Sequence, residues 1–115
     1  MNGGDFMELN KEVLKGHIDT LILAILDEKD SYGYEIAKEI KEKSDFSYSM
    51  GEGTLYPALK RLEEKQLIES YWQSTNLVGK RKYYKITDLG KTVLKDKLQQ
   101  WSQITNLINI LGGEV

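Results

Sequence analysis

Three consecutive basic residues, Lys80, Arg81 and Lys82, stand between a glycine and two tyrosines in the segment GKRKYYKIT, residues 79–87. Lysine and arginine bind phosphate groups by charge, and arginine can also donate two parallel hydrogen bonds to them. A basic run is nevertheless more often only a solvated surface. The segment therefore raises phosphate binding as a hypothesis, with a solvated surface as its alternative.

The charge of the chain is unevenly distributed. Residues 1–52 hold 12 acidic and 6 basic residues, a net charge of −6, whereas residues 53–115 hold 6 acidic and 10 basic residues, a net charge of +4. The formal net charge of −2 for the whole chain hides this basic half. The asymmetry favours a polyanion as the partner of residues 53–115.

Residue types that perform catalysis or bind metals are scarce. The chain has one histidine, His17, and no cysteine, which excludes disulfides and thiolate metal sites. The adjacent carboxylates Glu63 and Glu64 point in different directions from a helix and do not form an acid/base pair. We expect no enzyme activity, no metal and no cofactor, and interpret His17 as a helix-surface or dimer-interface residue.

Length and hydropathy limit the remaining classes. A chain of 115 residues is about one domain long. Its longest apolar stretch, residues 21–26, is far shorter than the roughly 18 to 20 residues that cross a bilayer. The acidic N-terminus leads into no cleavable apolar segment, so we expect a cytoplasmic protein without a membrane partner.

The spacing of apolar residues predicts three helices in the first part of the chain. The first starts at the N-cap residue Asn10 and continues for about five turns. The second opens at Ser31 or Tyr32 and stops near Ser44, and the third covers residues 52–65.

The period then changes from 3.6 to 2, which predicts a β-hairpin over residues 67–87 with the loop TNLVG at residues 75–79. In its second strand Tyr84 and Ile86 share the inner face, and Arg81, Tyr83 and Lys85 share the outer one. Thr87 then caps a last helix over residues 88–111 that ends at two glycines.

The third helix has two different faces when its residues are placed 100° apart. Leu55, Ala58, Leu59 and Leu62 lie on the core side, and the outer face holds Gly53, Thr54, Pro57, Lys60, Arg61 and Glu64. Small residues followed by basic ones suit a helix that enters a major groove. An amphipathic helix with an ordinary solvated face is the alternative.

Helix, helix, helix, hairpin and long helix is the order of a winged helix-turn-helix domain with a C-terminal extension. The segments LKGHIDTLILAIL, SYGYEIAKEI, GTLYPALKRLEEKQLIESYW and GKRKYYKITDLGK resemble successive signatures of the PadR family of bacterial transcriptional regulators. The resemblance runs from Leu14 to Lys91, and the single C-terminal helix is similar to that of the short members. It implies a mostly α fold with a small β-hairpin and a homodimer that represses transcription by occupying a promoter.

The predicted organisation is a flexible arm at residues 1–9, a winged helix-turn-helix domain at residues 10–87 and a dimerisation helix at residues 88–115. Double-stranded promoter DNA would bind to helix 52–65 and the wing 67–87. The resemblance implies DNA contacts by Tyr34, Gly53, Thr54, Tyr56, Lys60, Arg61, Lys80, Arg81 and Lys82. A winged helix that binds another protein instead of DNA is the alternative function.

The last helix carries an apolar stripe that is longer than one small core can cover. The predicted dimer interface consists of Leu94, Leu98, Trp101, Ile104, Ile108 and Leu111 with Leu21 of the first helix. The segment WSQITNLI is similar to the corresponding helix of short members that respond to multiple drugs. This implies a site for a hydrophobic aromatic effector formed by Trp101, Leu14 and Ile18, with a plain interface tryptophan as the alternative.

Overall fold

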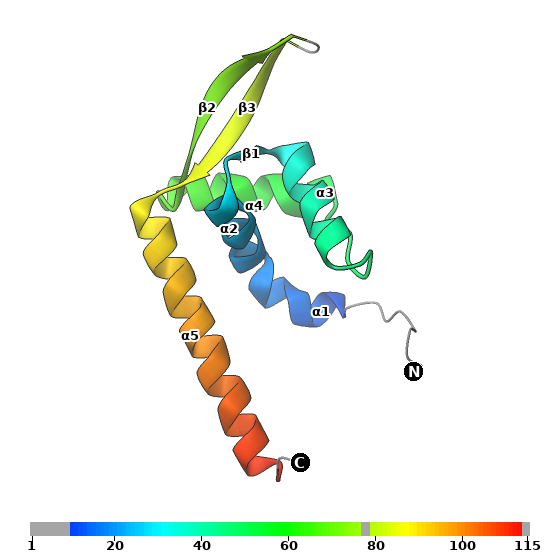
Figure 1. The fold of residues 1–115 in the computed structure, drawn as a ribbon, viewed down its shortest axis with the longest axis vertical. Helices are drawn as coiled ribbons and strands as arrows, with labels where there is room; N and C mark the ends of the chain where they lie inside the picture. Colours follow the sequence, from blue (N-terminus) through cyan, green and yellow to red (C-terminus); the bar gives the residue numbers. More distant parts are fainter. Residues whose placement is uncertain (1–9, 77–78, 114–115) are drawn as a thin grey trace.

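The computed structural model describes residues 10–76 and 79–113. Its elements in chain order are α1 (Lys11–Leu14), the 3-10 turn η1 (Lys15–His17), α2 (Ile18–Glu28), β1 (Ser31–Tyr32), α3 (Gly33–Lys43), α4 (Glu52–Glu64), β2 (Ile68–Thr75), β3 (Gly79–Ile86) and α5 (Asp88–Leu111). The β2–β3 hairpin projects from one end of the helical body, and α5 runs in the opposite direction (Figure 1). The predicted arm, residues 1–9, lies outside the described residues.

One hydrophobic core holds α2, α3, α4 and the inner face of the sheet together. Its fully buried members include Ile22, Leu23, Ile36, Leu55, Leu59, Leu62 and Ile68. The predicted core side of α4 is confirmed, because all four of its residues are at most 2% exposed. The predicted outer face of the same helix is exposed to solvent.

The first predicted helix is not continuous. Asn10 caps α1 as predicted, and its Oδ1 accepts hydrogen bonds from the backbone N–H of Glu12 at 2.8 Å and of Val13 at 3.3 Å. The chain then tightens into η1, where Gly16 has a low helix propensity and His17 leaves the helical region at φ −120° and ψ 4°. The regular α-helix resumes in α2.

The sheet has three strands, where the sequence predicts two. β1 pairs antiparallel with β3, and the strand order is β1-β3-β2. Ser31 and Tyr32 therefore form a strand, and α3 begins at Gly33 instead of at one of these two residues. A strand of two residues is too short to carry a visible period-2 pattern.

The hairpin register runs from Ile68 opposite Ile86 to Thr75 opposite Gly79. The predicted alternation is confirmed over the last three residues of β3, because Tyr84 and Ile86 are each 6% exposed while Lys85 is exposed to solvent. Arg81 and Tyr83, predicted on the same outer face as Lys85, are half-buried. Residues 77–78 of the predicted loop lie outside the described part of the chain.

The junction between the wing and α5 is tightly packed. Thr87 caps α5 as predicted, because its Oγ1 accepts a hydrogen bond from the Gly90 N–H at 3.0 Å. The same hydroxyl donates to the Gln66 carbonyl at 2.7 Å, and the Thr87 N–H donates to the Leu67 carbonyl at 3.0 Å. A Cβ at Gly90 would lie 2.1 Å from the Leu67 carbonyl oxygen, so only glycine fits there.

α5 extends away from the wing (Figure 1), and after Leu94 its described residues do not belong to the hydrophobic core. Leu94, predicted at the dimer interface, is 6% exposed and belongs to the hydrophobic core of this chain. Every side chain from residue 95 to residue 111 is exposed, including the large apolar ones Leu98, Trp101, Ile104, Leu107, Ile108, Ile110 and Leu111. In residues 10–76 and 79–113, no helix combines the length and the hydropathy that a membrane span requires.

We predict that Gly90→Ala lowers the free energy of unfolding by about 1–3 kcal/mol, because the new methyl group collides with a backbone carbonyl that cannot move aside. Urea denaturation at one protein concentration measures the change. Gly53→Ala is the matched control, since no atom lies within 4 Å of a Cβ at that position. Equal stability of Gly90→Ala and the wild type would contradict the prediction.

Candidate nucleic-acid interface

The N-terminal turn of α4 is exposed to solvent and carries mostly short side chains. Gly51 is its N-cap residue, and neither Gly51 nor Gly53 has an atom within 4 Å of the position that a Cβ would take. Thr54 is exposed, and Tyr56 is 46% exposed. Backbone and short side chains at this end of α4 therefore leave room for a close approach by a partner.

Tyr56 lies directly over the first residue of α3. A Cβ at Gly33 would be 2.5 Å from the Tyr56 hydroxyl oxygen, so the glycine makes room for the phenol ring. Gly33 has no predicted role in the sequence, although its position between two tyrosines in SYGYEI is a signal for such a contact. The contact fixes the start of α3 against α4.

A concave site of about 380 Å³ lies between the start of α3, helix α4 and strand β3. It is lined by Tyr32, Gly33, Tyr34, Tyr56, Arg81, Lys82 and Tyr84. Two cations, four phenol groups and the positive end of the α3 dipole thus converge on one surface, which suits a phosphate group. Four of the predicted DNA-contact residues meet here, namely Tyr34, Tyr56, Arg81 and Lys82.

Three tyrosines form a row across the sheet, because Tyr32, Tyr83 and Tyr71 lie opposite one another in register. In this tyrosine row the Tyr71 and Tyr83 rings stack with centroids 5.8 Å apart, and the Tyr83 and Tyr32 rings meet edge to face at 5.4 Å. The guanidinium carbon of Arg81 lies 4.2 Å from the Tyr32 ring centroid. A continuous series of ring contacts therefore connects β2 with Arg81, which lines the concave site.

The far end of the tyrosine row is tied to the residue before β1. The Tyr71 hydroxyl donates a 2.6 Å hydrogen bond to the Asp30 carboxylate, which raises the pKa of Tyr71 to about 12. Sequence reasoning missed this pair, because the two residues are 41 positions apart and neither stands in a recognisable motif.

Arg61 forms an ion pair with another residue of the chain. Its guanidinium donates a hydrogen bond to Asp19 of α2 at 2.6 Å, and this bond raises the pKa of Arg61. Lys60 beside it is exposed, and the described residues offer it no ion pair. Arg61 therefore joins α4 to α2 in this structure, and its predicted DNA contact would compete with Asp19.

A second hollow of about 500 Å³ lies between α1–α2 and α5. We call it the apolar groove; its lining is Val13, Leu14, Gly16, His17, Thr20, Leu21, Lys97, Leu98, Gln100, Trp101 and Ile104. The His17 and Trp101 rings meet edge to face at 4.9 Å. Of the predicted effector residues, Leu14 and Trp101 line the groove, whereas Ile18 is 8% exposed and belongs to the core.

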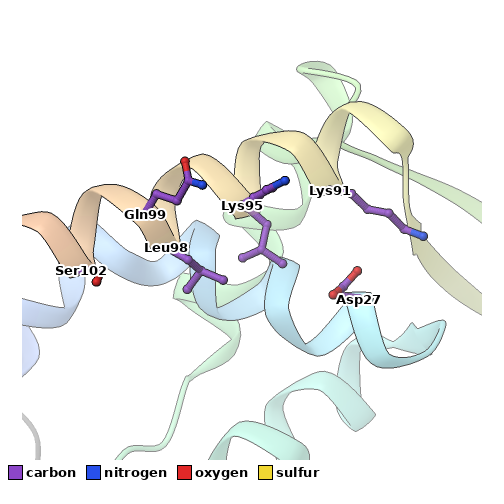
Figure 2. Close-up of a pocket in the computed structure, with 7 residues that line it drawn as sticks. Asp27, Lys91, Lys95, Leu98, Gln99 and Ser102 are labelled. Carbon is purple, nitrogen blue, oxygen red and sulfur yellow. The ribbon is translucent and has the colours of Figure 1, made fainter.

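A third hollow of about 360 Å³ lies between the end of α2 and α5 (Figure 2). Asp27 of α2 and the α5 residues Lys91, Lys95 and Leu98 line it together with other α5 side chains. Leu98 also lines the apolar groove, so α5 separates two hollows along its length. The described residues contain no cluster of three or more histidine, aspartate or glutamate side chains that could hold a metal ion.

Most of this chain is similar to known proteins. Residues 22–96 match the family described as transcriptional regulator PadR-like. The transcriptional regulator YqjI of Escherichia coli is 31% identical over 93 residues, which cover 81% of this chain but only 43% of YqjI. The chain thus corresponds to less than half of that relative.

Solved structures are similar over nearly their whole length. A transcriptional regulator from Clostridium thermocellum is 42% identical with a TM-score of 0.80, and the match covers 88% of this chain and 95% of the other. A PadR family transcription regulator from Clostridium difficile is 48% identical with a TM-score of 0.74, over 84% of this chain and 98% of the other.

Proposed function

Because this chain belongs to the PadR-like family of transcriptional regulators, we propose that it is a dimeric repressor that binds promoter DNA through α4 and the β2–β3 wing. We also propose that a flat hydrophobic ligand in the apolar groove releases it from DNA. The concave site carries the DNA-binding part of the proposal, since it brings cations and hydroxyl groups from α3, α4 and β3 onto one side of the molecule.

Two groups of residues would have different roles in DNA binding. Thr54 and Tyr56 stand on the open end of α4, where a helix reads base edges in the major groove. Lys80, Arg81 and Lys82 stand on the wing, where cations reach phosphates and release condensed counterions. The first pair would set sequence preference, and the wing would supply affinity for any sequence.

We predict that binding to a duplex from upstream of its own gene falls steeply with salt, by about 0.9 log units per log unit of salt for each phosphate contact. Fluorescence anisotropy over a salt series measures this slope. The double variant Lys80→Ala, Arg81→Ala should weaken binding to all duplexes alike, whereas Thr54→Ala should change which duplex is preferred.

The double variant Lys91→Ala, Lys95→Ala on α5 is the matched control for loss of two positive charges, and it should leave the affinity for DNA nearly unchanged. Binding that does not respond to salt, or no binding to any duplex, would contradict the proposal and favour the alternative of a protein-interaction module.

The exposed apolar side chains of α5 are the argument for a dimer. Its apolar side chains from residue 98 to residue 111 are between 52% and 77% exposed, and a contiguous apolar surface of this kind is typical of an interface between subunits. The apolar groove opens beside the same helix, so a second copy would also close the groove.

We predict that Ile108→Asp converts the dimer to a monomer, because the interface would have to bury an unpaired carboxylate. Sedimentation velocity at several protein concentrations measures the change. Asn106→Asp is the control, since a residue two positions away points about 200° around the helix and away from the predicted interface residues Ile104, Ile108 and Leu111. The two variants should differ clearly, and identical dimerisation of both would refute the interface.

Trp101 and His17 support the effector site, because their edge-to-face contact forms part of the groove wall. We predict that a neutral planar compound such as anthracene quenches tryptophan fluorescence by stacking in the groove. Trp101→Phe should abolish this quenching, whereas Trp72→Phe on the exposed wing should preserve it. Quenching that survives Trp101→Phe would exclude the site.

A further inference from the structure

The tyrosine row lies where the pairing between β1 and the wing strand β3 ends. β1 pairs with β3 only at Tyr83 and Tyr84, whereas the β2–β3 pairing continues outward to Gly79. Beyond Tyr83 the wing is a two-stranded hairpin, a structure that is only marginally stable on its own. The orientation of the cations farther out therefore depends on how firmly this row is held.

We propose that Tyr71 is a positioning residue for Arg81: its hydrogen bond to Asp30 holds the tyrosine row in place, and the row holds the Arg81 guanidinium where a DNA phosphate can reach it. This inference rests on the proposed DNA binding. It adds a role for two residues, Tyr71 and Asp30, that lie outside the concave site.

The hydrogen bond spans the whole sheet. β3 is the central strand, Tyr71 lies on β2 at one edge, and Asp30 directly precedes β1 at the other edge. The bond therefore connects the two edges of the sheet across the central strand β3. A tyrosine hydroxyl is protonated at neutral pH, so Tyr71 is a donor to Asp30 there, and the hydrogen bond raises the pKa of Tyr71 further, to about 12.

Arg81 is two residues beyond Tyr83 on the same strand and lies over the Tyr32 ring at 4.2 Å. A guanidinium that stacks on an aromatic face keeps its in-plane N–H groups free to donate. Arg81 also lines the concave site, so these donors border the proposed phosphate position. A side chain that is already oriented loses less conformational freedom on binding, which raises the affinity for the phosphate.

Anisotropy with a short duplex of mixed sequence tests this role, because phosphate contacts do not depend on base sequence. Tyr71→Phe keeps the ring but loses the donor, and we expect about three- to fivefold weaker binding. The slope of affinity against salt should stay unchanged, since no phosphate contact is removed. Arg81→Ala should lower that slope by about 0.9.

The double variant Tyr71→Phe, Arg81→Ala should bind no more weakly than Arg81→Ala alone, because Tyr71 acts through Arg81. An equal loss from Tyr71→Phe in both backgrounds, or no loss in either, would overturn the proposal. Asp30→Ala removes the acceptor and keeps every tyrosine but also removes a negative charge, so it should reproduce Tyr71→Phe in measurements on the free protein. Tyr48→Phe, which removes a hydroxyl from the core far along the chain from the wing, should leave the affinity unchanged.

A measurement without DNA separates this inference from the proposed function. The ring of Tyr32 should shift the NMR signals of the Arg81 side chain upfield in the free protein. Loss of this shift in Tyr71→Phe supports the positioning role, and its persistence refutes that role. Wild-type protein that binds no duplex would instead refute the proposed function and leave the NMR result to be judged by itself.

Discussion

The contact between Gly90 and the carbonyl of Leu67 sets the geometry of the whole molecule. Leu67 lies in the link between α4 and β2, and Thr87 binds the same link through its N–H and its hydroxyl. α4, the wing and α5 therefore leave one small junction in fixed directions. The open N-terminal turn of α4, the basic hairpin and the apolar part of α5 keep fixed positions relative to one another as long as this junction holds.

The periodic elements could be predicted from sequence, because their signals are local. Leu55, Leu59 and Leu62 repeat at helical spacing, and they are buried as that spacing requires. The alternation that places Tyr84 inside is equally local. The strand β1 could not be predicted in this way, since a two-residue strand depends on its pairing with β3 far along the chain. The break at η1 has one local signal, Gly16, but a single glycine does not by itself interrupt a strongly periodic helix.

The candidate site was predictable by residue type and only partly by arrangement. The basic wing residues are visible in the sequence, but their support is not: Tyr71 binds Asp30 across 41 positions. Arg61 shows the opposite difficulty, because an exposed arginine on the outer face of a helix is indistinguishable in sequence from one that pairs with Asp19. Pairwise contacts of this kind follow from the tertiary fold and carry no periodic signal.

The walls of the apolar groove differ from those of the concave site in how they are supported. Helix α1 has no buried residue, and α5 beyond Leu94 is exposed along its length, so few of the groove residues contribute to the core. Substitutions there cost little stability. The lining of the groove can therefore be changed with little effect on the core, whereas the junction tolerates no side chain at Gly90.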